Sequence, residues 1–149
     1  MNYHVSYVSF DNMPAVIGGA MYHLADAIKL SGGRHDKESV LQDLAAGNNQ
    51  LWIAYDDFGN IDGALTTSVE EYPGRKMLNI LFCGGENLED WHSQMLDLLY
   101  SSAKDNGCNG IELVGRKGWE RFLSKHGWQT QNIFCQIMFP ETEEKRNAA

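Results

Sequence analysis

Residues 75–91, RKMLNILFCGGENLEDW, decide the fold. The apolar run at 77–82 is short, dense and bounded, which predicts a buried strand. Two glycines follow, and Asn87 is placed to cap a helix, with Asp90 as a shorter version of the capping-box acid. Apolar residues recur behind this cap at helical spacing: Leu88, Trp91, Met95, Leu98 and Leu99. Glycines before a helix N-terminus direct backbone N–H groups at one point, which suits a phosphate or carboxylate, although a tight turn explains the same pattern.

Further strands are predicted on both sides of this stretch. Upstream, residues 51–55 and the alternating residues 61–69 are joined by a hairpin loop at 56–60, so three successive strands form an antiparallel meander. Downstream, a long helix separates 77–82 from a short strand at 110–114. This spacing has the form of a βαβ crossover, which predicts that 77–82 and 110–114 are adjacent and parallel.

The two ends of the chain complete the pattern. Residues 3–9 alternate weakly and predict an edge strand, and two helices follow, the first capped by Asp11 or Asn12 and the second by Asp36. After the strand at 110–114, a late helix precedes the apolar run 133–139, which we expect to supply the last strand. The sequence therefore predicts an α/β protein with a mixed sheet.

Length and composition restrict the class of protein. We expect one domain over residues 1–140 and a charged tail at 141–149. The net charge of −8 and the absence of a basic patch argue against nucleic-acid binding. No apolar run has the length of a membrane span, and the first residues lack the pattern of a signal peptide, so we expect a cytoplasmic protein. The three cysteines include no Cys-x-x-Cys pair, so no metal site is expected.

The order of the elements resembles the GNAT fold of the Gcn5-related N-acetyltransferases. Gly84-Gly85 at the central junction and His126-Gly127-Trp128 after the late helix belong to this resemblance, which covers residues 2–139. The segments LNILFCGG, GNIDGALTTSVEEYP and GRKGWERFLSKHGW are most similar to small GNAT-like proteins of phages and prophages. The resemblance implies an acetyl-CoA-dependent N-acyltransferase acting on a small-molecule or protein amine, in the cytoplasm of a bacterial host. The alternative is a catalytically degenerate, virion-associated module that binds phage structural proteins.

The resemblance also implies where acetyl-CoA binds. In that family the cofactor lies where the central strand and the next parallel strand splay apart, which corresponds here to residues 80–83 and 111–114, with the pyrophosphate near 84–88. The cofactor-binding residues implied on the central stretch are Leu81, Phe82, Cys83, Gly84, Gly85, Asn87 and Leu88. Arg116 and Lys117 precede the late helix and are expected to reach the phosphates, with a solvated basic turn as the alternative.

Two features depart from the family pattern. The family loop usually reads Gln/Arg-x-x-Gly-x-Gly/Ala, whereas this loop is shorter and carries Glu86, whose charge repels a pyrophosphate unless it turns outward. Leu123 stands where a tyrosine often protonates the leaving CoA thiolate, and Arg116 stands where an asparagine is common. Because leucine cannot donate a proton, either another group serves or the chemistry is lost.

Three carboxylates are candidates for the catalytic base. Glu70 and Glu71 end the strand before the central one, near where family members often place the acid that deprotonates the amine through water. Glu112 lies in a strand that otherwise reads as buried, where burial raises the pKa of a carboxylate. The alternatives are solvated turn acids and an outward-facing strand residue. Cys83 precedes a helix N-terminus, which lowers the pKa of a thiol, but a buried strand cysteine explains it equally.

Overall fold

The computed structural model describes residues 2–115 and 117–140 of the chain. It divides into two compact units, Met1–Leu113 and Val114–Ala149, which we describe separately. The first unit contains one five-stranded sheet in the order β1-β2-β3-β4-β5. Its strands are β1 (Tyr3–Val8), β2 (Gln50–Asp56), β3 (Ile61–Tyr72), β4 (Arg75–Gly85) and β5 (Gly110–Leu113). A short 3-10 helix, η1 (Phe10–Asn12), follows β1.

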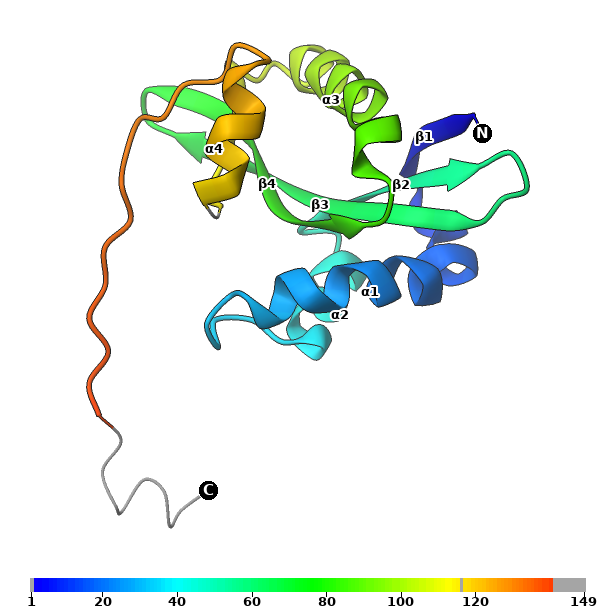
Figure 1. Ribbon diagram of the computed structural model, residues 1–149, viewed down its shortest axis with the longest axis horizontal. Coiled ribbons are helices and arrows are strands. Elements are labelled where there is room, and N and C mark those ends of the chain that lie inside the picture. The colour runs from blue at the N-terminus through cyan, green and yellow to red at the C-terminus, as the bar shows by residue number, and fades with distance from the viewer. Residues whose placement is uncertain (1, 116, 141–149) are drawn as a thin grey trace. The chain divides into compact units, whose positions relative to one another are not determined.

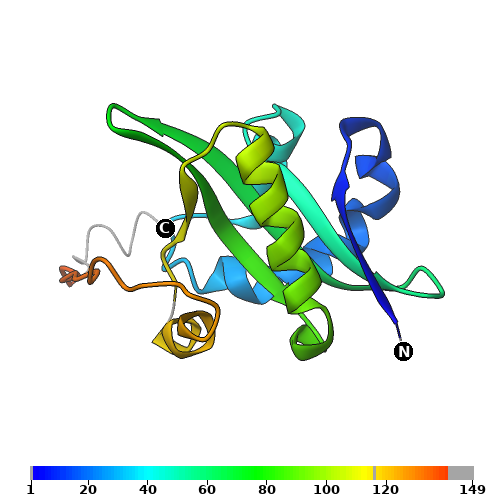
Figure 2. The same cartoon turned by 90° about the horizontal axis from the view of Figure 1, so that it is seen from above.

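The helices of the first unit cover both faces of this sheet. Helices α1 (Met13–Lys29) and α2 (Lys37–Ala45) lie on one face, and α3 (Leu88–Asp105) crosses the other (Figures 1 and 2). Strands β1 to β4 pair antiparallel in sequence order, and β5 pairs parallel with β4. The predicted mixed α/β sheet is therefore confirmed: an antiparallel meander followed by a parallel βαβ pair.

Each face of the sheet buries a separate apolar layer, as the helical spacing in the sequence requires. On the α1/α2 side the buried cluster includes Ala20, Met21, Leu24, Ile28, Val40, Leu44, Leu51, Ile53 and Ala64. On the other side α3 buries Trp91, Met95, Leu99 and Ala103. The predicted cap of α2 is also present, since the Asp36 carboxylate accepts a hydrogen bond of 2.8 Å from the backbone N–H of Ser39.

The β4–α3 junction differs from the prediction in two ways. Gly84 and Gly85 do not follow the strand but belong to it, pairing with Ala64 and Gly63 of β3. A side chain on Gly84 would collide with the carbonyl oxygen of His23, and one on Gly85 with the carbonyl oxygen of Asp62. Close backbone packing therefore explains both glycines.

The expected capping role of Asn87 is wrong. Asn87 precedes α3 in the left-handed conformation, with φ of 56°, and its side chain makes no capping hydrogen bond within the described part of the chain. Its side-chain amide instead donates to the phenol oxygen of Tyr3 at 3.1 Å. This contact ties the start of α3 to β1.

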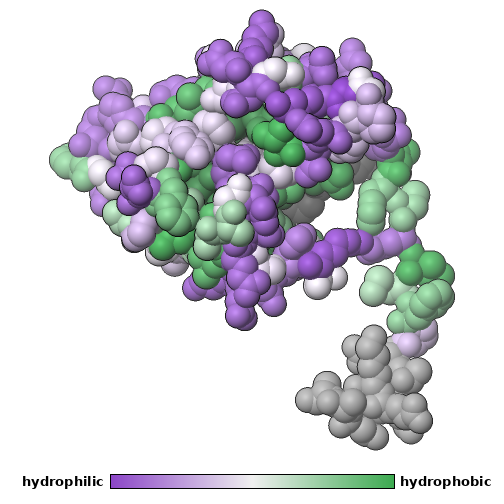
Figure 3. All heavy atoms as spheres, turned by 180° about the vertical axis from the view of Figure 1, so that it is seen from behind, coloured by the Kyte–Doolittle hydropathy of each residue, from purple (hydrophilic) through white to green (hydrophobic). Residues whose placement is uncertain are grey.

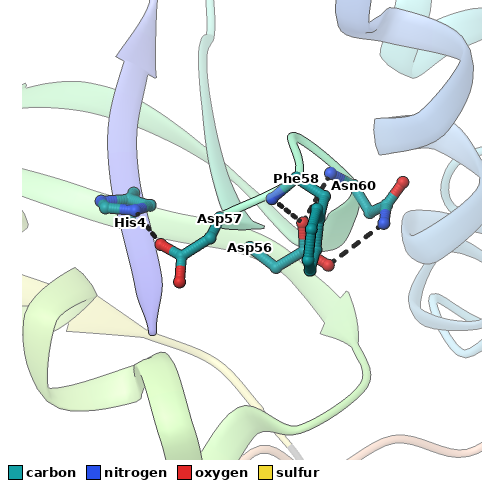
Figure 4. Close-up of polar contacts among 5 residues, drawn as sticks. All are labelled: His4, Asp56, Asp57, Phe58 and Asn60. Carbon is teal, nitrogen blue, oxygen red and sulfur yellow. Dashed lines mark hydrogen bonds and ion pairs between the residues drawn. The ribbon is translucent and has the colours of Figure 1, made fainter. Parts of the chain in front are cut away.

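The β2–β3 loop is the predicted hairpin loop, and one carboxylate holds it together (Figure 4). Asp56 Oδ1 accepts the backbone N–H groups of Phe58 and Asn60, and Oδ2 accepts the Asn60 side-chain amide. Burial would raise the pKa of Asp56, but these hydrogen bonds together lower it below its ordinary value. Beside it, His4 and Asp57 approach to 2.8 Å and join β1 to the loop.

The second unit contains α4 (Lys117–Ser124), in which Leu123 is buried. Gly127 follows with φ of 84°, the conformation that ends many helices. The strand expected at 133–139 is absent, since residues 128–140 form neither helix nor strand. Its large apolar side chains are exposed, with Ile133 at 86% and Phe139 at 84%. Figure 3 shows green, hydrophobic atoms along the stretch that leads to the grey residues. An apolar run makes a strand only when a partner supplies its backbone hydrogen bonds, and none does so among the described residues.

Candidate functional site

Strand β4 runs well beyond the end of its parallel neighbour. It has 11 residues, whereas β5 has four, and their pairing extends only from Met77↔Gly110 to Ile80↔Leu113. From Leu81 onward β4 pairs with β3 alone among the described residues. The far edge of this part of β4 therefore presents strand-like N–H and C=O groups, and the predicted cofactor-binding residues Leu81, Phe82, Cys83, Gly84 and Gly85 lie along it.

A β-bulge at Leu81 shifts the alternation of β4, so that the side chains after it point to different faces of the sheet than a regular strand would give. Thr66 pairs with Phe82, but the next residue of β3, Thr67, pairs with Ile80, so Leu81 is the extra residue. After the bulge, Phe82 packs against the α1/α2 cluster, and its ring lies edge-on to that of His35, with centroids 5.5 Å apart. The loop between α1 and α2 thus borders the edge of β4 at the point where β5 has ended.

Thr66 carries an unsatisfied group beside this bulge. The residue is fully buried, and its hydroxyl has no hydrogen-bond partner within the described part of the chain. Buried hydroxyls normally have a partner, so a polar group or a water molecule is expected here.

Cys83 is not an activated thiol. The residue as a whole is half-buried, but burial raises the pKa of its thiol to about 12. The thiol is therefore protonated at neutral pH, the opposite of what a helix N-terminus would produce. The structure favours the second sequence interpretation, a buried strand cysteine.

Two backbone N–H groups at the N-terminus of α3, next to the predicted pyrophosphate residues Asn87 and Leu88, donate to carbonyl groups of the protein itself. The backbone N–H of Glu86 donates to the carbonyl oxygen of Asp62 at 2.7 Å, and that of Asp90 to the carbonyl oxygen of Asn87 at 2.9 Å. Trp91 Nε1 donates to the carbonyl oxygen of Glu86 at 2.8 Å. All three bonds fix the loop, and the first two take the N–H groups of Glu86 and Asp90 away from a bound anion.

The charges around this helix N-terminus are negative. Glu89 and Asp90 lie in the first turn of α3, three and four residues after Glu86. Asp62 is linked to the same place, because Tyr3 donates to its carboxylate at 2.7 Å and accepts from Asn87. The hydrogen bond to Asp62, followed by burial, raises the pKa of Tyr3 and keeps its phenol a donor. Acids favour the dipole of α3 but repel a pyrophosphate.

A second cluster of acidic residues lies on one face of the sheet, across the neighbouring strands β3, β4 and β5. Ser68, Glu70 and Tyr72 alternate along β3, so they share a face. Asn79 of β4 pairs with Ser68 on one side and with Glu112 of β5 on the other. The Tyr72 phenol donates to Glu112 Oε1 at 2.7 Å, and the Ser68 hydroxyl donates to Glu70 Oε1 at 2.9 Å. We call these five residues the carboxylate patch.

The structure thus brings together two of the three predicted base candidates. Glu70 and Glu112 both act on the Tyr72 phenol, whose pKa is raised by the hydrogen bond to Glu112, then by burial and by both carboxylate charges. Glu71 alternates to the opposite face of β3, where its carboxylate lies 3.8 Å from Lys76 Nζ. The catalytic roles of all three stay predictions.

Sequence reasoning missed Ser68, Tyr72 and Asn79 as members of this patch. The alternation along 61–72 could have placed Ser68 and Tyr72 with Glu70, but Glu112 joins them only through the register of β4 with β5. Arg116 and the side chain of Lys117, predicted to contact phosphates, lie outside the described residues.

Other kinds of site find no support in the described part of the chain. No group of three or more His, Cys, Asp or Glu residues there is arranged to hold a metal ion. None of its helices combines the length and apolar character needed to cross a membrane.

Comparison with known proteins identifies the fold. No family model and no curated protein matches the chain. Among solved structures, it is similar to glucosamine-6-phosphate N-acetyltransferase from Arabidopsis thaliana, with a TM-score of 0.63 and 12% identity over 94% of this chain and 100% of that one. An aminoglycoside acetyltransferase from an uncultured soil metagenomic sample gives a TM-score of 0.67 and 14% identity over 94% and 100%.

A third similar structure is that of a predicted acetyltransferase from Clostridium acetobutylicum with acetyl-CoA. Its TM-score is 0.63 and its identity 16%, over 91% of this chain and 96% of that one. At such identities the likeness establishes the fold. The chain has the fold of the GNAT acetyltransferases, as its sequence predicted.

Proposed function

We propose that this protein is an acyl-CoA-dependent N-acyltransferase, with acetyl-CoA as donor and an amine as acceptor. The observation that carries the proposal is the edge of β4 at residues 81–85, which continues past β5 and lies on the strand next to Glu112. An extended chain bearing amide groups can pair with such an edge as an added strand. The similar structures named as acetyltransferases, one of them with acetyl-CoA, support this assignment.

The residues of this chain fit the pantetheine half of acetyl-CoA better than its pyrophosphate half. Backbone groups along 81–83 match the amides of pantetheine, and the buried hydroxyl of Thr66 lies beside this stretch. The N-terminus of α3 fits an anion poorly, since Glu86 uses its amide on Asp62 and acids crowd the first turn. Cationic side chains outside this helix end would then contact the phosphates of acetyl-CoA. Arg116 and Lys117 remain the residues predicted for this role.

The chemistry requires little more than positioning and a proton acceptor. When bound, acetyl-CoA supplies the acyl group as a thioester. Glu112, aided by the charge of Glu70, accepts a proton from the acceptor ammonium, so that a neutral amine is present next to the β4 edge. Holding the reactants in place supplies much of the remaining rate. Leu123 cannot protonate the leaving thiolate, and a thiolate leaves without such help more slowly.

The test is acetyl transfer from acetyl-CoA to a panel of primary amines, followed by release of free CoA thiol. We expect transfer by the wild type and by Asp97→Asn, which removes an exposed acid on α3. We expect acetyl-CoA binding without rapid transfer by Glu112→Gln. Transfer at the wild-type rate by Glu112→Gln would exclude this residue as the base, and no binding of acetyl-CoA by the wild type would exclude the enzyme.

A binding module without catalysis is the second candidate, and the partly occupied, acidic N-terminus of α3 favours it. In this case the backbone N–H groups of Glu86 and Asp90 serve to fix the loop rather than to hold a pyrophosphate. The module would bind neither acetyl-CoA nor CoA. Association with a virion stays a prediction from the sequence resemblance.

A further inference from the structure

We propose that Tyr72 is a positioning residue, which orients the Glu112 carboxylate so that one oxygen faces the acceptor amine. This inference rests on the proposed acyltransferase function. Tyr72 is the last residue of β3, and Glu112 lies on β5, so the contact reaches across β4. Neither residue's sequence neighbours would suggest the pair, since 40 positions separate them.

The geometry of the contact defines what Tyr72 does. Its hydroxyl donates to Glu112 Oε1 at 2.7 Å, a short hydrogen bond to an ionised acceptor. A glutamate side chain has several rotatable bonds, and one strong directional bond removes much of that freedom. With Oε1 engaged, Oε2 is the oxygen left to accept a proton.

The Tyr72 phenol is suited to donate a hydrogen bond to Glu112 but not to protonate the leaving thiolate. The hydrogen bond to Glu112, then burial and the charges of Glu112 and Glu70, raise the pKa of Tyr72 from its ordinary value. Arg75 is its register partner on β4. Tyr72 therefore stays a donor wherever Glu112 is ionised, and it does not replace the proton donor missing at Leu123.

Glu70 offers an internal contrast. Its partner Ser68 lies two residues away on the same strand, with a hydrogen bond of 2.9 Å. That bond is local and fixes Glu70 relative to β3 only. The Tyr72–Glu112 bond instead fixes a side chain of β5 relative to β3, across the strand that carries the β4 edge.

The kinetic test compares Tyr72→Phe, Glu112→Gln and the double variant, with Tyr22→Phe on α1 as a matched control, since Tyr22 is 74% exposed. We expect Tyr72→Phe to lower kcat about threefold to tenfold, the net effect of losing one hydrogen bond that solvent can reach. The KM for acetyl-CoA and the melting temperature should stay near wild type. In the Glu112→Gln background the second substitution should have no further effect on kcat.

A structural role alone would give a different result. It would lower the melting temperature and change KM and kcat together, and the effect would persist in the Glu112→Gln background. An unchanged kcat in a folded Tyr72→Phe protein, or additive losses in the double variant, would overturn the inference.

A second measurement does not depend on turnover. NMR titration of ring-labelled tyrosines, assigned with Tyr72→Phe, should find the Tyr72 pKa above 10.0 in the wild type and closer to 10.0 in Glu112→Gln. The same pKa in both proteins overturns the inference while leaving the proposed function intact. A wild type that transfers no acetyl group overturns the proposed function, and the positioning role with it, even when the titration detects the Tyr72–Glu112 contact.

Discussion

The carboxylate patch and the N-terminus of α3 are both acidic, but their acids are arranged for different purposes. In the patch, Glu70 and Glu112 each accept a hydrogen bond from a hydroxyl and lie on one face of the sheet. At α3, Glu86, Glu89 and Asp90 lie at the positive end of a helix, where negative side chains are favourable in themselves. The difference teaches that the partners of a carboxylate, rather than its charge, indicate its role.

The same substitution in the two places gives the largest expected contrast. Glu112→Gln should lower kcat by about 10²- to 10⁴-fold, because it removes the proton acceptor. Glu86→Gln should leave kcat within about twofold of wild type, since its charge serves only the helix end. The rate of acetyl transfer at saturating amine measures both effects. An equal decrease in kcat in the two variants would contradict the different roles that we assign to the two regions.

The glycines of β4 test whether the α3 junction is built for packing. Gly84→Ala should lower the free energy of unfolding by about 1–3 kcal/mol, because its new methyl group meets the carbonyl oxygen of His23. Gly18→Ala is the matched control, since nothing lies within 4 Å of the added carbon and alanine favours helix α1. A denaturant melt compares them, and a Gly84→Ala protein as stable as wild type would contradict the packing explanation.

Asp56 provides a third acid whose partners are fully specified. Hydrogen bonds lower its pKa in the folded protein, so its contribution to stability is present above the unfolded value near 3.8 and is lost as the pH falls through the folded pKa. Asp56→Asn should therefore be less stable than wild type at pH 7, and the gap should narrow below pH 3.8. Melting temperatures at pH 7 and pH 3 measure this, with Asp97→Asn as the control. A difference in melting temperature between wild type and Asp56→Asn that grows at pH 3 would contradict the lowered pKa of Asp56.

The smallest expected effect is on acetyl-CoA affinity at the α3 end. If Glu86 points away from the cofactor, Glu86→Gln should leave the Kd unchanged or tighten it about two- to threefold by removing an exposed, screened repulsion. Calorimetry of both proteins at low and at high salt measures this change. A weaker affinity in the variant would mean that the Glu86 carboxylate contributes to binding.

The sequence predicted most of the fold because apolar periodicity is a local property. The meander, the two helices before it and the parallel strand at 110–114 all follow from spacing and turn residues. The Asp36 cap was predictable for the same reason. The absence of a strand at 133–139 could not be predicted, because an apolar run only favours a strand, and the strand forms only when it pairs with a neighbour.

The site was less predictable from the sequence, since its residues are brought together by contacts between segments that lie far apart in the chain. Gly84 and Gly85 suggested a phosphate loop, but their reason is the approach of the His23 and Asp62 carbonyl groups. The bulge at Leu81 has no sequence signal, yet it directs Phe82 toward α1. Glu70 and Glu71 look equivalent in sequence, and only the register places Glu70 with Glu112.

Calorimetric titration of the wild-type protein with acetyl-CoA tests most directly whether the edge of β4 at 81–85 binds this cofactor, as we propose. We expect saturable binding of one acetyl-CoA per chain with a micromolar Kd, retained in Glu112→Gln and little changed in Glu86→Gln. No binding of acetyl-CoA by any of these proteins up to about 1 mM, a binding free energy weaker than about −4 kcal/mol, would contradict it and leave the binding module as the better description.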